Sequence, residues 1–234
     1  MGITERQTGI LNSIITEYIN SAHPISSQLL EEKYDFGIRP AAIRIEMQKL
    51  TDNGYLIQPH TSSGRVPTDK GYRLFVDRVL EKNFTDENFD DNFWEDLKID
   101  DTLKFIQSLT RSLAEHSSNL ALSYLPDEGI LWKEGWEEIL REPEFREEKF
   151  VFNFTQFLKD IEENIDNLKV NSRIKIYIGK ESPFPKIRDF SIIISKCHFP
   201  NKEEGIVSIL GPKRMAYEKN ISLINSLTKL LESF

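Results

Sequence analysis

The sequence predicts an α+β protein with two domains joined by an acidic linker. Short helices with recognisable caps and tight turns fill residues 1–82. A stretch with eight acidic residues and one lysine spans 84–101. Three apolar runs of strand length, followed by a last helix, lie beyond residue 172. We therefore expect a helical domain over 1–82, a linker over 83–101 and a mixed domain over 102–234.

Composition excludes several classes of protein. No apolar run approaches the roughly 20 residues that a membrane span needs, and the first residues lack the apolar core of a signal peptide. The single cysteine, Cys197, excludes an internal disulfide framework and a Cys-rich zinc site. We expect a cytoplasmic protein with no membrane partner, no metal and no cofactor, associated with the nucleoid if it binds DNA.

The net charge of −8 is unevenly distributed. Residues 1–80 are neutral, residues 81–170 carry −13 and residues 171–234 carry +5. The N-terminal segment is therefore free to carry a locally basic surface. An acidic middle segment would repel DNA and limit non-specific binding; an ordinary solvated surface is the alternative.

The first helix is predicted from a capping box. Thr4 and Gln7 have the spacing at which each side chain bonds the other residue's backbone, and apolar residues recur behind them at helical spacing to about Ala22. His23-Pro24 ends this helix, because the residue before proline avoids helical angles. Ser26 then caps a second helix that runs from Ser27 to Tyr34.

The third helix begins at Pro40 and carries the functional argument. Its residues Ile43, Met47 and Leu50 fall on one face, which we expect to be core. The opposite face and the residue before the helix bear side chains suited to base edges, because arginine can pair with guanine, glutamine with adenine and an apolar group with the thymine methyl. These candidates for base contact are Arg39, Ala41, Arg44, Ile45 and Gln48.

Two short helices joined by a tight turn at Gly37 predict a helix-turn-helix. A strand at Tyr55–Gln58, a polar loop over 59–65 and a return at Val66-Pro67 predict the wing of a winged helix, with another helix from Asp69 to Lys82. A loop of this kind lies on the sugar-phosphate backbone. Candidates for contact from the second helix and the wing are Ser26, Ser27, Gln28, His60, Thr61, Ser62, Ser63 and Arg65.

Each candidate has an ordinary structural alternative. Arg44 could be a surface cation and His60 a turn residue. Glu46, on the same helix, is better explained by an ion pair or a cap than by a contact to cytosine. Winged helices also serve as protein-interaction modules, so the fold alone does not assign DNA binding.

The C-terminal half predicts a small antiparallel sheet flanked by helices. We expect an amphipathic helix containing Leu103 to Leu113, then a strand at Leu120–Leu125, then two or three short helices over 135–168. The later strands and the last helix are expected at Arg173–Ile178, Phe190–Lys196, Gly205–Leu210 and Tyr217–Leu231.

No catalytic constellation is visible, so we do not expect an enzyme. Cys197 and His198 are adjacent, but neighbours on a strand point to opposite faces and would not form a dyad. Lys213 and Arg214 in the sequence GPKRM do not have the spacing of a phosphate loop. They could hold an anion, although a structural turn explains them better.

The segment from Glu5 to Asp77 resembles the HrcA family, the bacterial heat-inducible repressors of chaperone operons. The most specific stretches are IRIEMQKL at 43–50, GYLIQPHTSSGRVPTDKGYR at 54–73 and GPKRMAY at 211–217. The resemblance implies a winged-helix DNA-binding domain, a reduced GAF-like domain, and a homodimer that binds double-stranded DNA at an inverted repeat. It also implies the GroE chaperonin as a partner and release of the repressor by heat.

The sequence departs from the family pattern in the third helix. Arg39, Ala42 and Ile45 stand where the family usually has serine, threonine and asparagine, and Gln28 replaces a common lysine. Arg44, Glu46 and Met47 match. The departures predict a different or relaxed operator.

The chain also looks shorter than its family. The strands between Leu125 and Gly135 are expected to be nearly absent, and the family's inserted dimerising domain to be missing. Two alternatives to a repressor stay open: a ligand-gated regulator whose C-terminal domain binds a small molecule, and a winged-helix protein-interaction module.

Overall fold

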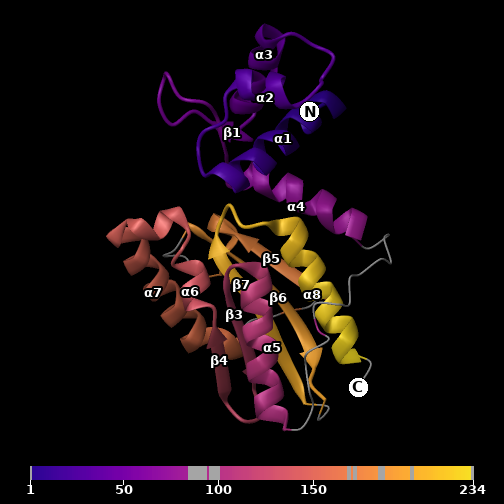
Figure 1. Ribbon diagram of the computed structural model, residues 1–234, viewed down its shortest axis with the longest axis vertical. Coiled ribbons are helices and arrows are strands. Elements are labelled where there is room, and N and C mark those ends of the chain that lie inside the picture. The colour runs from indigo at the N-terminus through magenta and orange to yellow at the C-terminus, as the bar shows by residue number, and fades with distance from the viewer. Residues whose placement is uncertain are drawn as a thin grey trace. The chain divides into compact units, whose positions relative to one another are not determined.

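The structure, a computed structural model, describes residues 2–83, 94, 101–167, 170, 173–183, 188–200 and 203–232. It separates into two compact units, Met1–Glu81 and Lys82–Phe234, which we call unit 1 and unit 2. Each unit is described by itself below, and the elements of both are labelled in Figure 1. None of the helices among the described residues is both long enough and apolar enough to cross a membrane.

Unit 1 consists of helices and a two-stranded antiparallel sheet. In chain order its elements are α1 (Glu5–Ser21), α2 (Ser27–Lys33), α3 (Pro40–Asp52), β1 (Leu56–Ile57), β2 (Val66–Pro67) and α4 (Asp69–Asn83). Leu56 pairs with Pro67 and Ile57 with Val66, so β1 and β2 form the base of a hairpin whose loop spans 58–65.

The helix ends of unit 1 confirm the signals in the sequence. The backbone amide of Gln7 donates to the Thr4 hydroxyl, while the Thr4 amide donates to the Gln7 side chain. Ser26 caps α2 by accepting from the backbone amide of Leu29. Pro40 is the first residue of α3, and Gly37 in the preceding turn has φ of 65°, a conformation that costs glycine little.

The core of unit 1 is an apolar stripe from α1 packed against α2, α3 and the hairpin. Burying these side chains provides most of the stabilisation of helices this short. The residues exposed by 4% or less include Ile10, Leu11, Ile14, Ile15, Ile25, Leu30, Ile43, Met47, Leu50 and Leu56.

Unit 2 contains a five-stranded antiparallel sheet in the order β4-β3-β7-β6-β5. The strands are β3 (Leu120–Leu125), β4 (Ile130–Glu134), β5 (Ile174–Ile178), β6 (Phe190–His198) and β7 (Glu204–Pro212). The helices are α5 (Thr102–Ser117), α6 (Trp136–Ile139), α7 (Glu148–Asn164) and α8 (Tyr217–Glu232). The expected antiparallel sheet flanked by helices is therefore confirmed.

Helices cover both faces of this sheet (Figure 1). On one face, Thr110 of α5 donates to the Ser123 hydroxyl of β3, and the Tyr217 hydroxyl of α8 contacts that of Ser191 on β6. On the other face, α7 packs Phe154 and Phe157 into a cluster with residues such as Phe190. Both faces of the inner strands are thus buried, which explains their nearly continuous apolar sequences.

The expectation that strands between Leu125 and Gly135 are nearly absent is wrong. Residues Ile130–Glu134 form β4, which pairs with β3 through five residue pairs, from Leu125 with Ile130 to Ala121 with Glu134. Every residue of β4 is half-buried, so burial does not alternate along this strand as it does along β5 at the opposite edge of the sheet. The helical region beyond it also differs from a series of short helices, since α7 has 17 residues.

The predicted acidic linker over 83–101 lies almost entirely outside the described residues. Trp94 is described and is 4% exposed, and its indole NH donates to the hydroxyl of Ser226 on α8 at 2.8 Å. Asp101 caps α5 by accepting from the backbone amide of Lys104. Trp94 therefore belongs to the core of unit 2.

Candidate nucleic-acid interface

Helix α3 is fixed by one face and exposed on the other. Ile43, Met47 and Leu50 are exposed by at most 4%, which sets the rotation of the helix against α1 and α2. Ala41, Arg44, Ile45 and Gln48 consequently lie on the exposed side. Ile45 is 57% exposed, which leaves a branched apolar side chain in water without any core to fill.

Arg39 and Arg44, the two arginines at the exposed side of α3, have no partner for their charge among the described residues. Within the part of the chain that the structure describes, no hydrogen bond or ion pair is found for the guanidinium of Arg44 or of Arg39. Arg39 is the N-cap residue of α3 and makes no side-chain cap bond. Both groups are exposed, so both are available to an anionic or hydrogen-bonding partner.

Gln48 is exposed but already bonded at both ends of its amide. Its Nε2 donates to Asp52 Oδ1 at 2.8 Å, and its Oε1 accepts from a guanidinium nitrogen of Arg65 at 2.9 Å. The side chain therefore links α3 to the hairpin.

The hairpin loop over 58–65 has an internally bonded tip. The Gln58 amide donates to the carbonyls of Thr61 and Ser63, and the Ser63 hydroxyl bonds the backbone of His60. Ser62 and Thr61 are exposed, and neither hydroxyl has a partner among the described residues. The tip thus offers Ser62, Thr61 and the exposed His60, while Ser63 maintains its shape.

Arg65, which the sequence predicts as a loop contact to the sugar-phosphate backbone, lies at the base of the loop, immediately before β2. It is 9% exposed, and its Nε donates to the Thr51 hydroxyl of α3 at 3.0 Å, in addition to its bond to Gln48. Its backbone forms an antiparallel bridge with Ile25, with N···O distances of 2.8 and 2.9 Å. The reason is packing: the returning chain is drawn inward before it enters β2.

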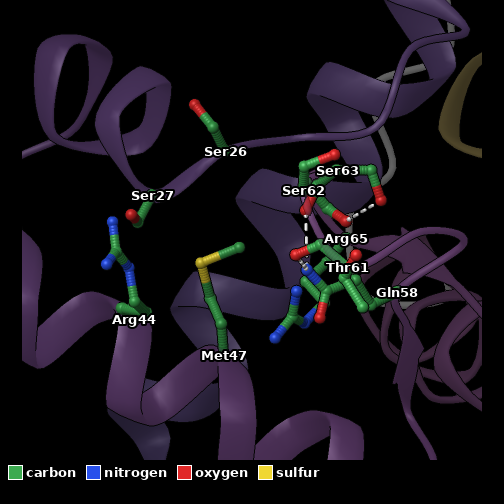
Figure 2. Close-up of a pocket in the computed structure, with 10 residues that line it drawn as sticks. Ser26, Ser27, Arg44, Met47, Gln58, Thr61, Ser62, Ser63 and Arg65 are labelled. Carbon is green, nitrogen blue, oxygen red and sulfur yellow. Dashed lines mark hydrogen bonds between the residues drawn. The ribbon is translucent and has the colours of Figure 1, made fainter.

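A hollow of about 360 Å³ lies between the loop and helices α2 and α3. Figure 2 shows Met47 between Arg44 and Ser27 on one side and the loop residues on the other. The residues that line it are Ser26, Ser27, Arg44, Met47, Gln58, Thr61, Ser62, Ser63, Gly64 and Arg65. Hydroxyl, amide and guanidinium groups therefore predominate around the hollow.

The remaining candidates on α2 have structural roles. Ser26 is exposed, but its hydroxyl caps the helix. Ser27 is buried, and the amide of Gln28 donates to Glu32 one turn later at 3.1 Å. Ser26 and Ser27 line the hollow, whereas Gln28 is not among its lining residues.

Glu46 forms the structural contacts expected for it. Its carboxylate accepts from Lys49 at 2.8 Å and from the side-chain amide of Gln7 at 2.8 Å. These bonds, that from Lys49 foremost, lower the pKa of Glu46 below its usual value. Glu46 thus stays ionised and joins α3 to α1.

Sequence reasoning missed Gly64, Thr51 and Asp52. A Cβ on Gly64 would lie 2.3 Å from the carbonyl oxygen of Ile25, so only glycine allows the loop to approach the connection between α1 and α2. Thr51 and Asp52 anchor Arg65 and Gln48. The contacts of Thr51 and Gly64 join residues far apart in the chain, 14 positions for Thr51 and Arg65, so no local pattern indicates them. Gln48 and Asp52 do have the i,i+4 spacing of a helical side-chain pair, which was the available signal for Asp52.

Arg214 and Cys197, two residues of unit 2 considered in the sequence, are both buried. Arg214 is 8% exposed and its guanidinium donates to Glu142 and Glu144. Cys197 is 6% exposed while His198 is exposed, so the two do not form a dyad, as expected. Burial raises the pKa of the Cys197 thiol to about 12.

Among the described residues, no three His, Cys, Asp or Glu side chains gather as a metal site would require.

These observations define the class: a two-unit α+β protein whose helical unit presents a helix face and a polar hairpin loop around one hollow. The pattern of the HrcA protein C terminal domain matches residues 74–221. The chain therefore belongs to the HrcA family.

Named relatives agree with this membership. A heat-inducible transcription repressor HrcA from Clostridium botulinum (strain Eklund 17B / Type B) is 26% identical over 336 residues, covering 100% of this chain and 98% of the relative. That from Thermoanaerobacter sp. (strain X514) is 27% identical over 334 residues, covering 100% and 97%. That from Alkaliphilus metalliredigens (strain QYMF) is 55% identical over 85 residues, which are 36% of this chain and 25% of the relative.

The alignments also show a difference in length between this chain and its relatives. An alignment of 336 residues exceeds this 234-residue chain by 102, so the Clostridium relative has about a hundred residues without a counterpart here. A crystal structure described only as that of a hypothetical protein has the same fold, with a TM-score of 0.86 at 20% identity over 99% of this chain and 98% of the other.

Proposed function

We propose that this chain is a sequence-specific transcription repressor that binds double-stranded DNA through unit 1. In this proposal unit 1 is a winged helix-turn-helix domain, with α3 in the major groove and the β1–β2 loop as the wing. The observation that carries the proposal is the exposed face of α3 with Ala41, Arg44 and Ile45 beside a polar loop. The relatives are named heat-inducible transcription repressors, which supports heat-shock genes as targets.

The charges and side chains suggest a division of labour. Arg44 reaches base edges, where a bidentate contact to guanine adds about 1–3 kcal/mol of discrimination. Arg39, expected among the base contacts, is the N-cap residue before α3 and is assigned instead, with the hydroxyls of Ser62 and Thr61, to phosphate oxygens, which position the protein without reading sequence. Ser26, Ser27 and Ser63 line the hollow beside this contact, and the exposed Gln28 and His60 follow and precede these lining segments in the chain.

Unit 2 is proposed to be a GAF-like dimerisation and regulatory domain. Its five-stranded antiparallel sheet with helices on both faces supports this assignment. A homodimer would match the two-fold symmetry of an inverted-repeat operator. By resemblance to the family, the repressor would act on the nucleoid in the cytoplasm, dissociate on heating and be refolded with help from the GroE chaperonin.

The proposal is tested by selecting bound duplexes from random DNA at a fixed, stated salt concentration. We expect an enriched inverted repeat for the intact chain. Arg44→Ala should relax base preference at one position of each half-site. Arg78→Ala is the matched control, because Arg78 is an exposed cation on α4, and it should retain the enriched sequence. No enrichment by the intact chain would rule out a sequence-specific repressor.

A further inference from the structure

The amide of Gln48 is held in one orientation by charged partners. Its NH₂ group donates to the carboxylate of Asp52 at 2.8 Å, and its carbonyl oxygen accepts from the guanidinium of Arg65 at 2.9 Å. Reading adenine requires both ends of the same amide. Each end of the amide keeps one further hydrogen-bonding site, because an amide has two N–H donors and two carbonyl lone pairs. Rotation of the side chain toward a base would nevertheless break one or both of its present charge-assisted bonds, which are stronger than bonds between neutral groups.

Arg65 connects three segments of unit 1. Its side chain bonds Thr51 and Gln48 of α3, and its backbone pairs with Ile25 immediately before α2. Next to it, Gly64 lies directly against the backbone of Ile25. The Thr51 hydroxyl in turn donates to the carbonyl of Met47, so the chain of bonds ends in the backbone of α3. A shift of the loop base must therefore disturb the helix.

A buried arginine in this position is poorly placed for phosphate. Only 9% of Arg65 is exposed, and its planar group is already oriented by two acceptors on α3. Arg44 and Arg39, by contrast, are exposed and have no partner among the described residues. On α3 itself the exposed Lys49 is paired with Glu46, and the exposed residues whose side chains have no partner among the described residues are Ala41, Arg44 and Ile45.

We infer that Arg65 is a positioning residue that fixes the wing and Gln48 to α3, and that Gln48 reads no base. Base discrimination then falls to Arg44 and Ile45, and the apolar Ile45 selects the methyl group of thymine. This inference rests on the proposed function and deepens it, since it names which exposed residues determine the operator.

The first test compares base preferences at each operator position by site selection. Gln48→Ala should change the preference at every position by less than about threefold. Ile45→Ala should reduce the preference for thymine at one position by at least about fivefold. Loss of an adenine preference in Gln48→Ala would overturn the inference, as would an unchanged thymine preference in Ile45→Ala.

The second test measures affinity for the selected duplex as a function of salt. If Arg65 positions the wing, Arg65→Ala should weaken binding about tenfold or more while the slope of log K against log salt is unchanged; loss of a phosphate contact would flatten it by about one unit. Arg65→Lys keeps the charge but not the planar fork, so it should bind as weakly as Arg65→Ala. A flattened slope for Arg65→Ala, or normal binding by Arg65→Lys, would overturn the positioning role.

A double-mutant cycle separates positioning through Gln48 from a general loss of stability. The combined Arg65→Ala/Gln48→Ala variant should bind no more than about twofold more weakly than the weaker single variant, because residues in one hydrogen-bond network are not additive. Additive losses would contradict coupling through Gln48. Thr51→Val removes the other acceptor of the Arg65 side chain without changing any charge. If Arg65→Ala does not fold, Thr51→Val takes its place in the measurement of affinity against salt.

The outcomes also separate this inference from the proposed function. If the intact chain binds no duplex, the proposed function fails, and there is no operator at which the base preferences of Gln48→Ala could be compared. If the intact chain selects an operator but Gln48→Ala loses one base preference, only the inference fails.

Discussion

At the scale of single residues, the carboxylate of Glu17 joins α1 to α2. It accepts from Lys33 at 2.7 Å and from the hydroxyl of Tyr34 at 2.9 Å, and only 8% of the residue is exposed. The bond from Lys33, together with that from Tyr34, lowers the pKa of Glu17 despite the opposing effect of burial. Because the folded-state pKa is depressed, this group stabilises the fold above the pKa of the unfolded chain and stops doing so as pH falls.

Glu17→Gln should therefore lower the free energy of unfolding by about 1–3 kcal/mol at pH 7, and this difference should shrink as pH falls below about 4. Urea unfolding followed by circular dichroism at several pH values measures it. Glu31→Gln, on the exposed side of α2, is the control and should change stability by less than about 0.5 kcal/mol. A Glu17→Gln effect of equal size at every pH would contradict the proposed linkage.

At the scale of elements, the turn between α2 and α3 sets the relation of the two helices. Gly37 has φ of 65°, and nothing lies within 4 Å of a Cβ built there. Any effect of a side chain at this position would therefore come from the backbone conformation alone. Gly9 offers the opposite case, because it lies within α1 and a Cβ there would meet Phe36 at an ordinary 3.9 Å.

Gly37→Ala should destabilise the protein by about 1–2 kcal/mol, whereas Gly9→Ala should stabilise it by up to about 1 kcal/mol. Thermal unfolding of the two variants beside the parent chain checks both signs. Equal shifts in the same direction would show that backbone conformation does not control this turn.

At the scale of the whole molecule, the proposed repressor has to deliver two copies of unit 1 to one operator. We expect two chains per duplex by sedimentation, with half-sites about 10 base pairs, one helical turn, or a multiple of that apart. Inserting about 5 base pairs between the half-sites would place them on opposite sides of the duplex. Tight binding should then be lost, whereas undiminished affinity would indicate that each chain binds alone.

The signals that predicted unit 1 are local ones. The capping box at Thr4 and Gln7, the cap at Ser26 and the proline at the start of α3 act within a few residues, so the printed sequence displays them directly. The buried face of α3 followed in the same way from the spacing of Ile43, Met47 and Leu50.

What the sequence did not reveal depends on distant partners. The side chain of Arg65 is bonded by Thr51 and Gln48, 14 and 17 residues away, so the sequence showed only its charge and its place in the loop. The strand β4 had no alternating pattern because all of its residues are half-buried. The residues between Pro126 and Gly129, where Gly129 has φ of 64°, were the available turn signal for that hairpin.

The burial of Cys197 makes the chain convenient for site-directed labelling. A thiol with a pKa of about 12 is essentially all protonated at pH 8, and thiol reagents attack the thiolate. Since Cys197 is the sole cysteine of the sequence, a second one introduced at Ser62 would be alkylated selectively without first replacing the native residue. A fluorophore attached there would follow the loop during titration with duplexes.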